Sequence, residues 1–420
     1  MHHFEYRNGT LHCEDVPIET IAGEVGTPFY CYSHATLTRH FNAFNEAFSE
    51  VDHLTCFSVK ACSNIAILRL FASLGSGMDI VSGGELYRAL KAGVPPEKIV
   101  FSGVGKSAEE IIYALEAGIL MFNLESPQEM LALNECAARL DRRAPMAIRV
   151  NPDVDANTHP YISTGLKENK FGIDLEIAES MYAQAREMSN LDIVGVGCHI
   201  GSQLTEVSPF LDTLRRMKLL IEALRKEDIQ IRYLDLGGGL GITYSEEDPP
   251  HPREYARALL QEVDGLDCGL IFEPGRVIVG NAGILVTRVL YTKEGPVKNF
   301  VVVDAGMNDL IRPSLYDSYH QVQPVIDNKR PELQADVVGP ICETGDFLAR
   351  ERNLPRVDQG ELLAVMSAGA YGFTMSSNYN SRPRPPEVLV WGDTFEVIRS
   401  RETYEDLVRG ERLPDFLIDD

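Results

Sequence analysis

Lys60 is the residue in this sequence with the clearest potential for covalent chemistry. It ends the apolar, strand-like run Cys56 to Val59, and a predicted helix from Ser63 to Leu74 follows it. A lysine amine at the end of an apolar strand is partly desolvated, which makes it a usable nucleophile toward aldehydes. A lysine that only extends its amine into solvent at the rim of a sheet has the same local sequence. The residues after the other strands must therefore decide between these interpretations.

Reactive and anion-binding residue types also follow other strand-like runs. They are Asp79 in the second run, His199 and Ser202 after the sixth, Gly237, Gly238 and Gly239 after the seventh, and Glu273, Gly275 and Arg276 after the eighth. If the runs are parallel strands of a barrel, their carboxyl ends meet at one rim, and these side chains gather there. Chance placement would spread such residues over both rims.

These residue types match the groups of one cofactor. Backbone N–H groups of a glycine run can approach a phosphate, and Ser202 and Arg276 can add charge-assisted contacts. The flat ring of His199 can lie over an aromatic ring, and a buried Glu273 can pair with a protonated ring nitrogen. With a lysine that can form a Schiff base, the set specifies pyridoxal 5'-phosphate. Singly, a glycine run is also typical of tight turns, and a lone histidine is often a core residue.

Eight short runs rich in Val, Ile and Phe must position these residues. They begin near Cys56, Met78, Ile99, Leu120, Met146, Ile193, Tyr233 and Leu270, and amphipathic stretches follow most of them. Such alternation over about 240 residues matches a (β/α)8 barrel, which has roughly 250. An open doubly wound sheet would need a glycine-rich turn after its first strand, where this chain has Lys60 to Ser63. We therefore predict a barrel over residues 33–279.

After about Val279 the pattern changes to strands with few helices. The strand-like runs are 283–289, 300–304, 334–338, 362–366, 388–391 and 395–399. They predict an α/β protein whose second, mainly antiparallel β-domain contains residues 1–32 and 280–420. The segment 103–107 resembles a nucleotide-binding P-loop, but Val100 occupies the position of its first glycine, so we reject that match.

Composition limits the classes of function. The 420 residues are 44% hydrophobic and 24% charged, as in soluble globular proteins, and their number indicates two domains. A net charge of -23 argues against nucleic acid and anionic membranes as partners. The eight cysteines form no C-x-x-C pairs, which predicts reduced thiols in a cytoplasmic protein and no metal site.

Longer motifs make the sequence resemble the fold type III pyridoxal-phosphate decarboxylases, and most closely the branch that acts on diaminopimelate. In the barrel the matching stretches are 57–61, 199–202, 237–239 and 273–276, and in the second domain they are 304–316, 339–346 and 369–372. The resemblance covers about residues 25–395 and implies the alanine-racemase-like fold. Segments 62–64 and 102–105 depart from the family pattern without removing a primary role.

The resemblance implies a role for each of the matching residues. The catalytic residues would be Lys60 and Cys342. The cofactor would be held by Lys60, Asp79, His199, Ser202, Gly237, Gly238, Gly239, Glu273, Gly275, Arg276 and Tyr371, and the substrate by Arg276, Arg312, Tyr316, Glu343 and Tyr371. The implied reaction converts meso-2,6-diaminopimelate to L-lysine and carbon dioxide, the last step of lysine biosynthesis. It would occur in a homodimer whose partner subunit supplies Cys342 and Glu343. Separately, the length of the segment 158–170 between the fifth and sixth strands suggests a lid.

Four alternatives remain open at this stage. A decarboxylase of the same fold acting on ornithine or a carboxylated polyamine would recognise a different distal group. A racemase would use a tyrosine base and would not need Cys342 and Glu343. A non-catalytic pyridoxal-phosphate-binding paralogue would lose the motifs of the second domain. A cofactor-free, lysine-dependent aldolase would not need His199 or Glu273.

Overall fold

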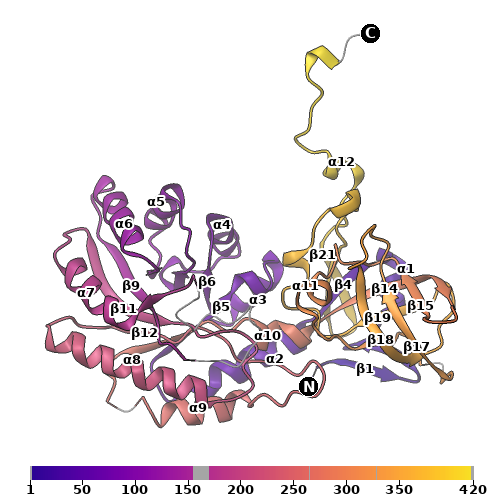
Figure 1. Cartoon of the computed structure of the whole chain (residues 1–420), viewed down its shortest axis with the longest axis horizontal. Coiled ribbons are helices and arrows are strands. Elements are labelled where there is room, and N and C mark those ends of the chain that lie inside the picture. Colours follow the sequence, from indigo (N-terminus) through magenta and orange to yellow (C-terminus); the bar gives the residue numbers. More distant parts are fainter. Residues whose placement is uncertain (1, 155–169, 264, 328, 418–420) are drawn as a thin grey trace. The chain divides into compact units, whose positions relative to one another are not determined.

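The computed structural model of this chain describes residues 2–154, 170–263, 265–327 and 329–417 (Figure 1). The chain divides into two compact units, Thr36–Asn281 and Met1–Ala35 with Ala282–Asp420. The predicted lid at 158–170 lies outside the described residues, apart from its last residue. Among the helices of the described residues, none has both the length and the apolar character needed to cross a membrane.

The first unit is built on eight parallel strands. They are β5 (His53–Ser58), β6 (Gly77–Ile80), β7 (Ile99–Phe101), β8 (Met121–Leu124), β9 (Ala144–Asn151), β11 (Leu191–Cys198), β12 (Tyr233–Asp235) and β13 (Gly269–Phe272). Each pairs in parallel with the next, and β13 pairs with β5, so the sheet closes on itself. The two-residue strand β10 (Ile173–Asp174) adds to β9. The predicted barrel is confirmed.

Helices follow the strands and surround them in Figure 1. They are α2 (His34–Asn45), α3 (Ile65–Ser73), α4 (Gly83–Lys91), α5 (Ala108–Ala117), α6 (Pro127–Arg139), α7 (Leu175–Arg186), α8 (Ser208–Lys226), α9 (Pro252–Leu260) and the short α10 (Arg276–Val279). Side chains of Asn64, Ser82, Ser107 and Ser126 accept backbone N–H groups at four of the helix starts. These caps end the preceding loops within a few residues of the strands, which keeps the loops at the rim short.

Side chains inside the barrel form two layers. An apolar layer, contributed by six strands, consists of Cys56, Val100, Met121, Ala147, Val194 and Ile271. Alternate residues of a strand face the same side, so the residues two positions further along also point inward. On most strands these are polar: Ser58, Asp79, Ser102, Asn123, Arg149, Asp235 and Glu273, all buried. The barrel therefore has an apolar floor below a polar layer at its carboxyl end.

The second unit is a mainly antiparallel β-structure. Its strands are β4 (Phe29–Ser33), β14 (Gly283–Lys293), β15 (Phe300–Val303), β16 (Val322–Pro324), β17 (Glu332–Val338), β18 (Phe347–Pro355), β19 (Leu362–Val365), β20 (Glu387–Trp391) and β21 (Thr394–Arg399). They form one sheet in the order β18-β17-β15-β14-β4-β20-β21, with β19 paired to β14 and β16 to β19. Among the described strands of this unit, only β15–β17 and β20–β4 are parallel pairs. The predicted mainly antiparallel character is confirmed.

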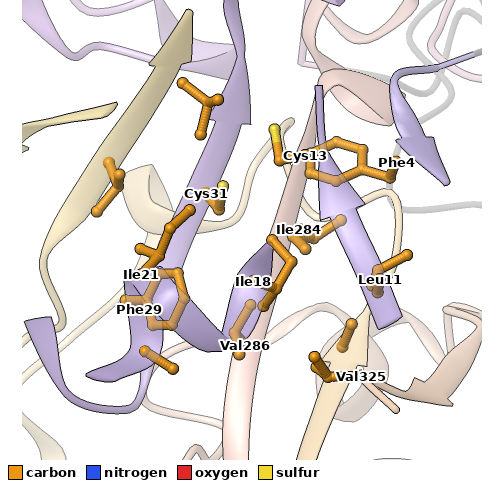
Figure 2. Packing of buried hydrophobic residues seen from close by; sticks show 14 of the residues in the cluster. Phe4, Leu11, Cys13, Ile18, Ile21, Phe29, Cys31, Ile284, Val286 and Val325 are labelled. Carbon is orange, nitrogen blue, oxygen red and sulfur yellow. The ribbon is translucent and has the colours of Figure 1, made fainter. Parts of the chain in front are cut away.

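The N-terminal segment supplies much of the apolar core of this unit. A small sheet of β1 (Phe4–Arg7), β2 (Thr10–Cys13) and β3 (Val16–Pro17) precedes helix α1 (Ile18–Val25). Figure 2 shows Leu11 and Ile18 packed with Phe29 of β4 and with Ile284 and Val286 of β14. Two further short helices, α11 (Arg312–Tyr316) and α12 (Tyr404–Leu407), lie among the later strands.

Candidate active site

Lys60 lies in a 3-10 turn, Val59–Ala61, directly after β5. Its Nζ is 2.8 Å from Oδ2 of Asp79, whose side chain is fully buried, whereas the Lys60 side chain remains 35% exposed. The hydroxyl of Ser58 lies 2.8 Å from the same carboxylate oxygen and 2.9 Å from the carbonyl oxygen of Glu273. The amine is thus held at the mouth of the barrel, between a buried carboxylate and solvent, where a substrate can reach it.

His199 follows β11 and is half-buried at the same mouth. The backbone N–H of Gly238 donates to its Nδ1 at 3.1 Å. Burial lowers the pKa of His199 well below its ordinary value, and the positive charges of Arg149 and Lys60 lower it further. The ring is therefore neutral, carries its proton on Nε2, and presents a flat uncharged surface.

Glu273 directly follows β13 and lies in the polar layer. Burial raises the pKa of Glu273 well above its ordinary value, and the nearby carboxylates of Asp235 and Asp79 raise it further, while Lys60 lowers it. Burial also raises the pKa of Asp235 to about 6, although hydrogen bonds from Asn123 and Gly237 oppose this rise. Adjacent buried carboxyl groups do not ionise together, so this pair shares a proton that resides on Glu273.

The loops after β11 and β12 are locked together beside His199. The side-chain amide of Gln203 donates to the carbonyl of Ile242 at 2.6 Å, and its oxygen accepts the N–H of Ile242 at 3.1 Å. A Cβ at Gly238 would lie 2.3 Å from the carbonyl oxygen of Glu273, and Gly239 has a φ of +118°. Glycine is therefore required at both positions. The N–H groups of Gly237 and Gly238 already donate to Asp235 and His199, so an anion at the mouth would use the rest of the run.

Arg276 begins the short α10 after β13, with Gly275 at its start. Its guanidinium donates to the hydroxyl of Tyr244 at 2.7 Å and to Oγ of Ser202 at 2.9 Å. The structure thereby brings Lys60, Asp79, His199, Ser202, Gly237, Gly238, Gly239, Glu273, Gly275 and Arg276 to one rim of the barrel. Tyr244, which holds Arg276, was absent from the sequence-based set.

The sequence-based set also missed several members of the polar layer. Ser102 and Asn123 hydrogen-bond within it, and Asp235 accepts from Asn123 at 2.8 Å. Arg149 forms a buried ion pair with Glu125 at 3.0 Å. Each of these four residues lies two positions after an inward-facing residue of its own strand run. Counting along each strand in steps of two from the apolar floor would therefore have identified them.

Lys106, in the rejected P-loop segment, has a different role. Its Nζ lies 2.6 Å from Oε1 of Glu129, and it donates to the carbonyls of Gly103 and Asn123 at 2.7 Å each. Only 1% of the Lys106 side chain is exposed, so its amine serves the internal ion pair with Glu129.

The other predicted site residues lie in the β-unit. Arg312 is buried at the start of α11, with its guanidinium carbon 5.7 Å from the centre of the Tyr316 ring. Cys342 and Glu343 are exposed in the loop before β18. One oxygen of Asp346 holds this loop by accepting the N–H of Ile341 at 2.6 Å, and the other accepts the N–H of Met307 at 2.6 Å.

Tyr371 lies in the β-unit segment that precedes the turn Phe373–Met375. Its φ is +56°, a left-handed conformation that a bulky residue adopts only when its surroundings enforce it. A Cβ at the next residue, Gly372, would lie 2.8 Å from the hydroxyl oxygen of Tyr30, so the segment packs tightly against β4.

The barrel mouth fits pyridoxal phosphate on its own geometry. An amine is available for the aldehyde, and a flat neutral imidazole can lie against the pyridine ring. A buried carboxyl group can pair with the ring nitrogen, and the glycine run, Ser202 and Arg276 provide donors for the phosphate.

Comparisons with known proteins agree with this fit. Residues 34–280 match the family model described as "Pyridoxal-dependent decarboxylase, pyridoxal binding domain". Fold and site thus define a pyridoxal-phosphate-dependent decarboxylase. The chain is 52% identical over 409 residues to the diaminopimelate decarboxylase of Haemophilus influenzae, covering 97% of this chain and 98% of that protein. It is 53% identical to the Pseudomonas aeruginosa enzyme of the same name, covering 98% and 99%.

Solved structures are similar over nearly the whole chain. The diaminopimelate decarboxylase of Helicobacter pylori complexed with L-lysine has a TM-score of 0.91 and 44% identity, covering 93% of this chain and 98% of that one. The enzyme from M. jannaschii in co-complex with L-lysine has a TM-score of 0.94 and 40% identity, covering 99% of each. The chain belongs to the diaminopimelate decarboxylase family, and its cofactor is pyridoxal phosphate.

Proposed function

We propose that this protein decarboxylates meso-2,6-diaminopimelate to L-lysine and carbon dioxide. The observation that carries the proposal is the barrel mouth, where Lys60, His199 and Glu273 meet the glycine run in a chain about half identical to named diaminopimelate decarboxylases. When bound, pyridoxal phosphate supplies a conjugated electron sink for the electron pair left on the α-carbon as carbon dioxide departs.

The barrel residues would bind and orient the cofactor. Lys60 is its covalent attachment point, and Asp79 holds the amine in place through the 2.8 Å ion pair. The neutral ring of His199 would pack against the cofactor ring, and the Glu273 carboxyl group would hold a proton at the ring nitrogen. Further cofactor residues in this proposal are Ser202, Gly237, Gly238, Gly239, Gly275, Arg276 and Tyr371.

The substrate would be recognised at both of its ends. Diaminopimelate carries a second complete amino-acid group, so its distal end needs partners of both charges. Arg276 and Arg312 can grip the distal carboxylate through paired N–H donors, with hydroxyls from Tyr316 and Tyr371, while Glu343 takes the ammonium. Ornithine, which ends in an ammonium alone, would not use the arginines. This difference favours diaminopimelate over a diamine-forming reaction.

Cys342 would deliver a proton from its Sγ to the α-carbon after carbon dioxide has left. The thiol and the neighbouring Glu343 are both exposed on the β-unit, in a loop fixed by Asp346. We place them in the active site of a partner subunit, so that the working enzyme is a homodimer. The eight free thiols support a reducing, cytoplasmic location.

Carbon dioxide release measured over a panel of substrates tests the proposal. The purified protein, saturated with pyridoxal phosphate, is expected to release carbon dioxide from meso-diaminopimelate and to leave L-lysine. Ornithine, arginine, lysine and a carboxylated polyamine serve as comparison substrates. Release from one of these at a higher kcat/KM, or from none of the five, would overturn the assignment. Sedimentation of the same sample tests the homodimer separately.

A further inference from the structure

Four side chains in the polar layer form a hydrogen-bonded chain across the inside of the barrel. Nδ2 of Asn123 donates to Oδ2 of Asp235 at 2.8 Å and to Oγ of Ser102 at 3.1 Å. Oγ of Ser102 donates to Oε1 of Glu273 at 3.1 Å. These residues come from β8, β12 and the ends of β7 and β13, on different sides of the closed sheet.

The direction of each hydrogen bond is fixed by the donors and acceptors available. Both N–H groups of the Asn123 amide are used, one on a carboxylate and one on a hydroxyl oxygen. Because Ser102 accepts from Asn123, its own proton is directed to Glu273. Asp235 is held in turn by the N–H of Gly237, which donates to its other oxygen at 2.9 Å. In this arrangement Glu273 accepts from Ser102, and Asp235 accepts from Asn123 and Gly237.

The surroundings of Asn123 fit this arrangement. Its backbone carbonyl accepts from Nζ of Lys106 at 2.7 Å, which anchors the residue from outside the layer. Gly197 of β11 leaves room for the amide, because a Cβ there would lie 3.3 Å from Oδ1 of Asn123. Asn123 and Ser102 are 3% and 4% exposed, so no bulk water competes for these hydrogen bonds.

We propose that Ser102, Asn123 and Asp235 are positioning residues that fix the orientation and the shared proton of Glu273 toward the cofactor ring nitrogen. This inference rests on the proposed role of Glu273. The proton transfer would be balanced: the O–H bond of the Glu273–Asp235 carboxyl pair breaks, an N–H bond forms on the ring nitrogen, and both members of the pair are left as carboxylates beside the positively charged ring.

Three variants test the chain of donors. Ser102→Ala removes the donor to Glu273, and Ser102→Thr restores a hydroxyl. The double variant Asn123→Asp with Asp235→Asn keeps the number of carboxylates but turns the central donor into an acceptor, so Ser102 is drawn away from Glu273. Asn134→Ala, in α6 and away from the mouth, is the matched control, since its side-chain oxygen is also buried.

Each variant is measured in three ways: the dissociation constant for pyridoxal phosphate added to the apoprotein, the pH profile of the visible absorption of the bound cofactor, and kcat and KM. Ser102→Ala and the double variant are expected to weaken cofactor binding or lower kcat by about 10- to 100-fold, the effect of losing one hydrogen bond to a charged group, with KM unchanged. The pH profile of the absorption should shift in both. Ser102→Thr and Asn134→Ala should behave as wild type.

Several results would overturn the inference. One is a wild-type pH profile and kcat in both Ser102→Ala and the double variant. Another is an equal loss in Ser102→Ala and Ser102→Thr accompanied by a lower unfolding temperature, which would mean that Ser102 serves packing alone. If the wild-type protein binds pyridoxal phosphate and releases carbon dioxide while these variants match it, the proposed function stands and only the inference fails. If the wild type does neither, the proposed function fails first.

Discussion

The tight approach of Gly238 to the backbone of Glu273 leads to a sharp prediction. In Gly238→Ala the new Cβ would lie 2.3 Å from the carbonyl oxygen and 3.1 Å from the carbonyl carbon of Glu273, and backbone atoms cannot rotate away as a side chain can. That peptide is also fixed on both sides. The N–H of Glu273 donates to the carbonyl oxygen of Gly237 at 2.8 Å, and the hydroxyl of Ser58 donates to the carbonyl oxygen of Glu273 at 2.9 Å.

The expected loss of stability follows from the steric clash and from the fixed position of the Glu273 peptide. Overpacking in a close-packed interior costs about 1–3 kcal/mol, and each hydrogen bond broken by the displaced peptide adds about 1 kcal/mol. We therefore expect Gly238→Ala to lower the free energy of unfolding of the barrel by about 2–4 kcal/mol. Displacement of Glu273 should also weaken binding of pyridoxal phosphate to the folded protein.

Urea unfolding of the apoprotein, followed by far-ultraviolet circular dichroism, measures this loss, because the long helices α2 to α9 belong to the barrel unit. Gly84→Ala in α4 is the matched control. Its new Cβ would meet only Oγ of Ser82, at an ordinary 3.7 Å, so we expect a gain of about 0.4–1 kcal/mol. An unfolding midpoint for Gly238→Ala equal to that of wild type would refute the steric reasoning.

Four further outcomes are expected. Burial raises the pKa of Asp309 to about 7, so its native state keeps a proton that the unfolded chain loses above about pH 4, and stability should fall as the pH rises from about 4 to about 7. Asp309→Asn should flatten this fall in a series of thermal unfolding curves, and an unchanged slope would exclude Asp309 as its source. Lys106→Met leaves Glu129 buried without its ion-pair partner and should cost about 3–5 kcal/mol in urea unfolding, and adding Glu129→Leu should recover most of the loss. Cys342→Ala should bind pyridoxal phosphate normally yet lose about 10²- to 10⁴-fold in kcat, so unaltered turnover would remove its proposed role. Arg312→Ala should lose about 2–5 kcal/mol of transition-state binding for diaminopimelate in kcat/KM and keep its cofactor affinity, whereas equal loss of both would make Arg312 structural.

The barrel could be predicted because its strands repeat one simple pattern. Each strand is a short apolar run, and a charged residue or glycine marks its carboxyl end, so the rim residues could be read directly from the sequence. Ser102 and Asn123 were missed because they are uncharged, whereas Asp235 is charged and ends β12 but was passed over in favour of the glycine run that follows it. Their importance depends on the inward register, which requires the closed sheet to be known.

The β-unit was predicted less completely, for local reasons. Helix α1 was not predicted within residues 1–32, because Ile18 and Ile21 are β-prone residues that follow Val16 and because the start of the helix carries no side-chain cap. Strand β18 went unpredicted because its centre is charged, and its pairing with β17 shifts register twice. The left-handed conformation of Tyr371 has no sequence signal, since tertiary contacts impose it.

The position of β4 has a consequence for how the protein is made. Residues Phe29–Ser33 occupy the centre of a sheet whose neighbouring strands, β14 and β20, are translated only after the whole barrel segment has been synthesised. Synthesis proceeds at about 5–20 residues per second, so this strand spends many seconds on the ribosome without its partners. Deleting residues 1–35 would therefore remove β4 from between β14 and β20, and the unit that contains these residues is the last to be completed during synthesis.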